Sequence, residues 1–265
     1  MNALHAPRRE RPVTRSRGIL FVAVLGLALV VSGCNNYRVR FLYPQETRTN
    51  TFNSRPEVSI YVAEPEDLRP SRERQGRGVI HTLHFPPDGK MDQPAVHTVR
   101  RAMMQDLLQT RVARLVQNPD NADYILTSQL LSMTTELRRP SSAWAFPLAA
   151  GIAVGTIAGV GTDVGHGVKL GLVGAFLGTF IPAPANTEAT VEMKLELRDR
   201  LSNDVVWSTT CTGTHERTIR LSLSAREDKK IAEDFLPKAL KRANACAVGQ
   251  LYAHLQEQSE AGVGR

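Results

Sequence analysis

Residues 190–198 have the most regular alternation in this chain: after Thr190, apolar and charged side chains alternate at every position. A period of two residues fits an extended strand with one face buried and the other face in water. The segment therefore predicts a sheet that other elements cover on one face. The apolar side chains are Val191, Met193, Leu195 and Leu197, and the charged ones are Glu192, Lys194, Glu196 and Arg198.

Three further segments are predicted strands of the same sheet. Residues 58–63 and 124–135 are rich in apolar and β-branched side chains, which favour strands. In the second of these, Leu126 and Leu130 fall on one face, and Met133 falls on the other. Residues 205–216 follow a Ser-Asn-Asp turn and are predicted to return as a hairpin partner, with Val205, Trp207 and Cys211 on one face.

Two amphipathic helices are predicted to cover that sheet. The first begins near Asp92 and ends before Asn118-Pro119, and the second covers residues 235–255 with Pro237 in its first turn. Residues 64–89, rich in Arg, Pro and Gly, are predicted to form a long loop. The expected class is α+β: a small, mostly antiparallel sheet with two amphipathic helices on one face. The sheet domain is expected in two parts, over residues 56–143 and 184–256.

Between these two parts, residues 144–183 form two apolar arms around a short polar centre. Glycines four residues apart share one helix face and let two backbones approach closely, as in membrane helices. In water each would cost a helix about 1 kcal/mol relative to alanine. The pattern predicts a glycine-zipper helical hairpin that enters a membrane. One alternative is a buried hairpin or a glycine-rich loop covering the domain, and a smaller one is a membrane β-hairpin, which the lack of polar and apolar alternation in the arms disfavours. The packing positions are Gly151, Gly155, Gly159, Gly167, Gly171, Gly174 and Gly178.

The N-terminus resembles a secretory leader. A basic stretch ending at Arg17 precedes the apolar run 19–31, which is shorter than the ~20 residues of a membrane-spanning helix. The run ends in Val31-Ser32-Gly33-Cys34, which resembles the bacterial lipobox. We expect a signal peptide over 1–33, cleavage before Cys34, and stable membrane anchoring by several acyl chains on its sulfur. An ordinary signal peptide with a chance cysteine is the alternative.

Two segments flank the predicted domain, and the net charge is concentrated in the N-terminal leader. Residues 34–55 are expected to be a polar tether, and residues 257–265 a disordered tail. The net charge is +7, but the first 33 residues hold five arginines and one glutamate. The remainder keeps 28 basic and 25 acidic residues, so bulk charge does not indicate a nucleic-acid partner.

The side chains that could act in catalysis or bind a metal ion do not follow the spacing of a known catalytic or metal-binding motif. Ser222, His215 and Asp228 lack the spacing of a nucleophile elbow, and His81 and His84 have no third ligand nearby in sequence. We therefore expect no enzyme activity, no cofactor and no metal. Export would place Cys211 and Cys246 in an oxidising compartment, where they either form a disulfide or remain two buried thiols.

The layout resembles the TraT family of outer-membrane surface-exclusion lipoproteins. The shared features are the lipobox, an early βαβ unit ending in Ala122-Asp123-Tyr124, the glycine-patterned hairpin and the alternating strand 190–198. The resemblance implies a lipid-anchored homo-oligomer that blocks conjugative transfer and resists complement. Asn35, directly after the cysteine, favours the outer membrane under the enterobacterial sorting rule. The chain is also similar to CsgG-type and YajG-type lipoproteins. That similarity implies a periplasm-facing accessory protein with an envelope protein partner in transport, secretion or envelope assembly.

Overall fold

The computed structural model describes residues 38–45, 58–76, 78–79, 82–138, 149, 151–153, 156, 170–174, 183–221 and 225–263. The chain divides into two units, Met1–Tyr37 and Arg38–Arg265, and the described residues all belong to the second. The predicted signal peptide and Cys34 lie outside them.

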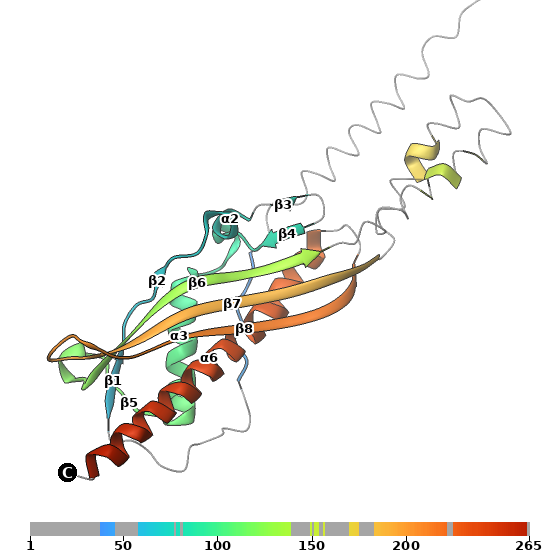
Figure 1. Cartoon of the computed structure of the whole chain (residues 1–265). Coiled ribbons are helices and arrows are strands. Elements are labelled where there is room, and N and C mark those ends of the chain that lie inside the picture. The colour runs from blue at the N-terminus through green and yellow to red at the C-terminus, as the bar shows by residue number, and fades with distance from the viewer. Residues whose placement is uncertain are drawn as a thin grey trace, which may run out of the picture. The chain divides into compact units, whose positions relative to one another are not determined.

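Three long antiparallel strands form one side of the sheet (Figure 1). They are β6 (Tyr124–Arg138), β7 (Ala183–Asp199) and β8 (Val205–Leu221), with β8 outermost. Every second residue of β7 from Ala185 to Leu197 is buried, so the predicted alternation extends well before residue 190. The turn between β7 and β8 contains Asn203 at φ 61°, a left-handed conformation that asparagine adopts more readily than most residues.

Five short strands complete the sheet on the other edge of β6. β1 (Ser59–Val62), β2 (Glu66–Asp67) and β4 (Thr82–Phe85) pair with β6 one after another along its length. Beyond them, β5 (Arg114–Leu115) pairs with β1, and β3 (Gly78–Val79) pairs with β4. β1 and β2 run parallel to β6, whereas β4 runs antiparallel to it.

The expected small, mostly antiparallel sheet is therefore wrong: over the described residues the sheet is mixed and has eight strands. The parallel pair arises because the chain crosses from β1 through a helix before it returns as β6. The predicted loop at residues 64–89 is also wrong. It contains β2, the helix α2 (Ser71–Gln75), β3 and β4. Two-residue strands are too short to show an alternation in sequence.

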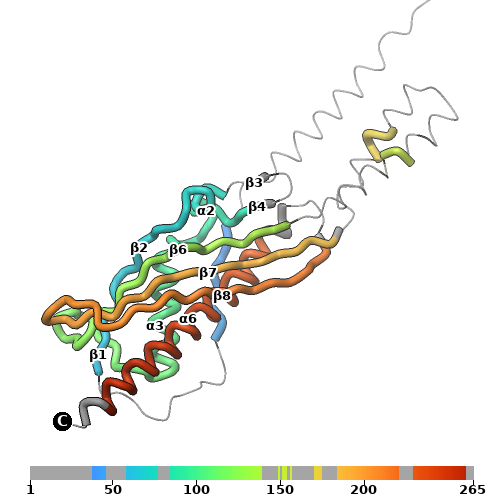
Figure 2. The backbone as a smooth tube through the Cα atoms, in the orientation of Figure 1, coloured from blue at the N-terminus to red at the C-terminus, as the bar shows by residue number. Residues whose placement is uncertain are grey.

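Two long helices pack against the sheet (Figure 2). α3 (Ala95–Thr110) contacts α6 (Ala225–Val263), and α6 lies along β8, β7 and β6. α6 begins ten residues before the predicted start, so Pro237 lies inside the helix instead of in its first turn. α3 begins after Pro94, not at Asp92. Short 3-10 turns, η1 (Asp88–Lys90) and η2 (Pro119–Asn121), precede α3 and β6.

The predicted glycine-zipper hairpin is also contradicted as part of the fold. Across the part of the chain that the structure describes, no helix combines the length and the apolar character needed to cross a membrane. Gly151, Gly171 and Gly174 lie in the described helical residues 151–153 and 170–174. The physical reason is that glycine lowers helix propensity, so a four-residue glycine spacing does not by itself specify a continuous helix. The remaining predicted positions, Gly155, Gly159, Gly167 and Gly178, lie outside the described residues.

Candidate functional site

α6 and β8 approach each other closely at one joint, and a small residue on the strand makes this possible. A Cβ atom on Gly213 would lie 2.1 Å from the carbonyl oxygen of Ala239 and 2.4 Å from the backbone nitrogen of Ala243. Only glycine fits there, because the opposing atoms belong to the helix backbone. α6 and β8 run in opposite directions, so residues near the start of β8 lie beside residues near the end of α6. At the ends of this joint, His215 meets Phe235 edge-on at 4.9 Å, and Trp207 stacks on His254 at 6.1 Å.

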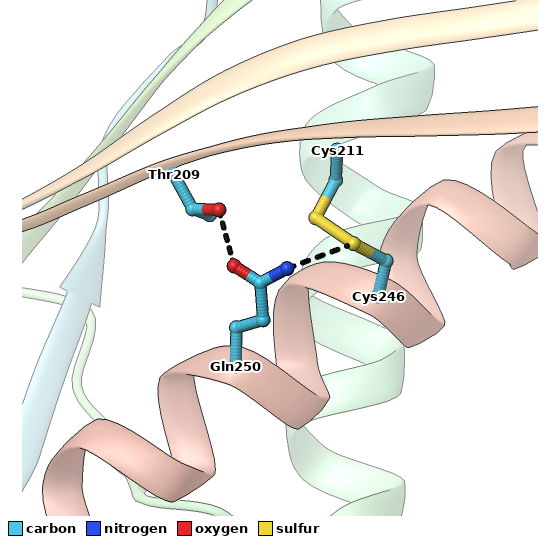
Figure 3. The surroundings of a disulfide bond; sticks show 4 residues. All are labelled: Thr209, Cys211, Cys246 and Gln250. Carbon is cyan, nitrogen blue, oxygen red and sulfur yellow. Dashed lines mark hydrogen bonds between the residues drawn. A yellow bond between two sulfur atoms is a disulfide. The ribbon is translucent and has the colours of Figure 1, made fainter.

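A disulfide between Cys211 and Cys246 closes the same joint, as Figure 3 shows. The two Cα atoms are 5.9 Å apart, and Cys211 is fully buried. Gln250 donates from its amide nitrogen to the Cys246 sulfur at 3.4 Å and accepts a hydrogen bond from the Thr209 hydroxyl. The strand and helix are therefore linked by close packing, by a covalent bond and by hydrogen bonds within three turns of α6.

Two β-bulges change which side chains face the helices. Leu197 pairs with Trp207 and Arg198 pairs with Val205, so Val206 is the extra residue. Trp207 and Cys211 face α6, but Val205 is 45% exposed and lies on the other face, contrary to the prediction. On β6, the register shift at Leu131 places Met133 on the buried face with Leu126 and Leu130, which the simple alternation also missed.

The chain enters the folded domain through residues 38–45, which lie against the helices. Val39 is fully buried and bridges to Met91: its N–H donates to the Lys90 carbonyl at 2.7 Å, and its carbonyl accepts from the Asp92 N–H at 3.0 Å. The backbone N–H of Arg40 donates to the Glu233 carboxylate at 2.9 Å. The prediction of a tether over 34–55 is therefore wrong for residues 38–45, because the buried valine and its hydrogen bonds fix them to the domain.

A buried carboxylate joins this entry segment to both long helices. Asp106 on α3 is 3% exposed and accepts hydrogen bonds from the Tyr43 hydroxyl, the Lys241 ammonium at 2.5 Å and the Asn244 amide at 3.1 Å. The Lys241 nitrogen also lies 5.4 Å from the centre of the Tyr43 ring. Several charge-assisted hydrogen bonds to one buried carboxylate hold the three segments in a fixed arrangement.

We expect Asp106→Asn to lower the free energy of unfolding by about 2 kcal/mol, because it removes the charge that three donors share. Urea titration followed by circular dichroism would measure the loss. Lys241→Met provides the control: in that background the cost of Asp106→Asn should shrink, since the ammonium partner is already gone. Equal costs in both backgrounds would show that the two side chains do not interact.

Buried charges also fix the strands that pair with β6. Glu73 of α2 accepts from the Ser132 hydroxyl and the Met133 N–H, both at 3.1 Å, where β6 is flanked by neither β2 nor β4. The Arg69 guanidinium pairs with Asp67 at 2.7 Å and with Asp88 at 2.8 Å. Its hydrogen bonds hold the pKa of the Asp67 carboxyl below the ordinary value. These contacts have a structural role, since each charge is matched by a partner from a neighbouring element.

A surface groove of about 460 Å³ runs beside α3. His97 lies 2.9 Å from Glu64 at its edge, and Leu108, 59% exposed, lines it together with Arg100 and Arg101. The remaining lining residues are Met104 and Gln105. The arrangement offers cations beside apolar surface, which suits an acidic, partly apolar partner.

Of the residues considered for a hydrolase or a metal site, the structure describes the side chains of His215 and His84. His215 contacts Phe235, and its pKa is lowered by burial and then by the nearby Lys238 and Arg242 cations. Ser222 and His81 lie outside the described residues, while the described His84 has a buried Nδ1 atom with no hydrogen-bond partner. Among the described side chains there is no group of three His, Cys, Asp or Glu residues that could hold a metal ion.

No known protein family and no curated protein matches the chain. Several solved structures resemble it at low sequence identity. Protein XCC0632 of Xanthomonas campestris is 13% identical, covering 85% of this chain and 99% of that chain, with a TM-score of 0.46. A putative neuraminyllactose-binding hemagglutinin homolog of Helicobacter pylori is 10% identical, covering 83% and 98%, with a TM-score of 0.41. Uncharacterized lipoprotein B of Nitrosomonas europaea is 14% identical, covering 84% and 96%, with a TM-score of 0.34. TM-scores this low do not establish a common fold, so the chain is assigned to no family.

Proposed function

We propose that this chain is a non-enzymatic lipoprotein of the bacterial outer membrane, exported to the envelope and anchored by lipid on Cys34. The observation that carries the proposal is the disulfide between Cys211 and Cys246. Structural disulfides form and persist in oxidising compartments such as the periplasm and are rare in the cytosol. This compartment matches the leader that ends in Val31-Ser32-Gly33-Cys34.

The proposed role within the envelope is that of a TraT-like, homo-oligomeric surface-exclusion lipoprotein. It is supported by the order of the lipobox, the unit formed by β1, α3 and β6, and the long alternating strand β7. An accessory lipoprotein of a transport, secretion or assembly complex is the second candidate. The groove beside α3 favours it, because exposed Leu108 and two arginines would suit an envelope protein partner. The mass of the particle extracted in mild detergent distinguishes the two: a homo-oligomer has a multiple of the mass of this chain, whereas a complex contains the mass of a foreign subunit.

The anchor is tested by growing cells with a clickable fatty acid. We expect the wild-type chain to incorporate the label and the Cys34→Ser variant to incorporate none and to accumulate as uncleaved precursor, because only the sulfur can accept the diacylglycerol. Cys246→Ser is the matched control, since it removes a cysteine far along the sequence and should keep the label. Equal labelling of the wild type and the Cys34→Ser variant would contradict the proposed function.

A further inference from the structure

The point where the chain enters the folded domain limits where a membrane can lie. Three residues separate Cys34 from Arg38, and an extended chain spans at most about 3.6 Å per residue. The Cα atom of Cys34 is therefore at most ~14 Å from that of Arg38, whatever conformation the intervening residues adopt. Val39, directly afterwards, is buried and held by backbone hydrogen bonds to Lys90 and Asp92, so the tether cannot lengthen by peeling away without breaking these contacts.

This entry point lies in the half of the domain away from the turn between β7 and β8, and we call this half the entry end (Figure 2). Arg40 is bonded to Glu233, eight residues from the start of α6. Lys90, whose carbonyl accepts the Val39 N–H, follows β4, and the last residue of β4, Phe85, pairs with Thr135 in the second half of β6. The entry end therefore comprises residues 38–40, η1, the second half of β6 and the first turns of α6.

The opposite end, which we call the turn end, carries the connection between β7 and β8. The Tyr124 hydroxyl donates to Gln258 near the end of α6, and Tyr124 pairs with Asp199 beside the turn. Glu233 and Gln258 are 25 helical residues apart, or about 38 Å. Leu201, 81% exposed, marks the turn end.

Cations are exposed at the entry end. Arg38 and Arg40 are both exposed and flank buried Val39, so the alternation that turns the valine inward turns both arginines outward. Lys230 on α6 is exposed three residues before Glu233, which accepts the Arg40 N–H. Each cation close to an anionic leaflet strengthens binding roughly fivefold.

We propose that the entry end is the membrane-facing surface of the domain, with Arg38 and Arg40 against the phosphate groups of anionic lipid headgroups. This inference rests on the proposed function, because it takes Cys34 as the lipid-bearing residue. The short tether holds the surface at the bilayer, and the two arginines fix its orientation. The turn end, with Leu201, then points away from the membrane.

The test uses the full lipidated chain in vesicles of phosphatidylcholine and phosphatidylglycerol whose headgroups carry a spin label. A fluorophore is attached to Lys230→Cys at the entry end or to Leu201→Cys at the turn end, while the native disulfide leaves no other reactive thiol among the described residues. We expect the spin label to quench the fluorophore at position 230 strongly. The fluorophore at position 201 should be quenched no more than in vesicles without spin label. Equal quenching at both positions, or stronger quenching at 201, would overturn the inference.

The arginines are tested with Arg38→Gln/Arg40→Gln in the labelled Lys230→Cys chain. Quenching in anionic vesicles should fall to its level in pure phosphatidylcholine, whereas the matched pair Arg111→Gln/Arg200→Gln, exposed near the turn end, should leave it unchanged. Unchanged quenching in the first variant overturns the role of the arginines. Fatty-acid labelling of the same protein distinguishes a failure of the proposed function from a failure of this inference alone. An unacylated Cys34 overturns the proposed function and this inference with it, whereas an acylated chain quenched at Leu201 overturns only the inference.

Discussion

Replacing Gly213 by alanine should lower the free energy of unfolding by about 3 kcal/mol, the upper range for overpacking a tight contact. The new methyl group would meet the carbonyl oxygen of Ala239 and the backbone nitrogen of Ala243, at 2.1 and 2.4 Å. Backbone atoms cannot move aside as a flexible side chain does, so α6 must shift away from β8 as a unit. That shift would loosen the apolar stripe of α6, which is buried against the sheet over most of its length.

Gly249→Ala is the matched control for this prediction, because it makes the same chemical change on α6 where a Cβ atom would contact nothing within 4 Å. It should raise the free energy of unfolding by about 1 kcal/mol through helix propensity. A third variant, Gly213→Ala/Ala243→Gly, should recover little stability, because the closest opposing atoms belong to the backbone and remain in place. Urea titration measures all three. A Gly213→Ala variant as stable as the wild type would show that helix and strand do not approach as closely as described.

The sequence alone predicts the long strands of this fold but not their faces throughout. The alternation at residues 190–198 gives the buried side of β7 correctly, because each charged side chain there marks the exposed side. The same alternation misplaces Met133 and Val205, since each lies beyond a β-bulge that shifts the register by one residue. A bulge depends on how two strands pair, and the pattern within one strand does not reveal it.

The contacts that define the candidate site are similarly hidden from a single sequence. Val39 lies between two arginines and gives no periodic signal, yet it fixes the entry of the chain. In the sequence Asp106 resembles a solvent-exposed residue that interrupts an apolar stripe. Its partners Lys241 and Tyr43 become apparent only when α6 and residues 38–45 are packed against α3. In the sequence Gly213 resembles a glycine at a flexible position. In the structure, glycine is needed there because the backbone of α6 approaches closely. Each case depends on partners far away in sequence.

Removing the disulfide should produce the other large loss of stability. Cys211→Ala/Cys246→Ala is expected to lower the free energy of unfolding by about 3–4 kcal/mol, because the bond closes a loop between residues 35 positions apart and limits the unfolded chain. The loop spans the second half of β8 and the first half of α6, the two elements that meet at Gly213. The covalent bond and the close packing therefore stabilise the same joint, and their effects should not be additive.

A reductant distinguishes this bond from a pair of buried thiols. Adding a phosphine reductant during urea unfolding should shift the wild-type midpoint to that of Cys211→Ala/Cys246→Ala, while the double variant itself should not respond. Non-reducing mass spectrometry of the exported wild-type protein should show the peptides of Cys211 and Cys246 joined. In the Gly213→Ala variant the same bond should form more slowly, because displacement of α6 moves Cys246 away from the 5.9 Å Cα separation that suits a disulfide. Two free thiols in the exported wild type would remove both the stabilisation and the main structural support for a periplasmic location.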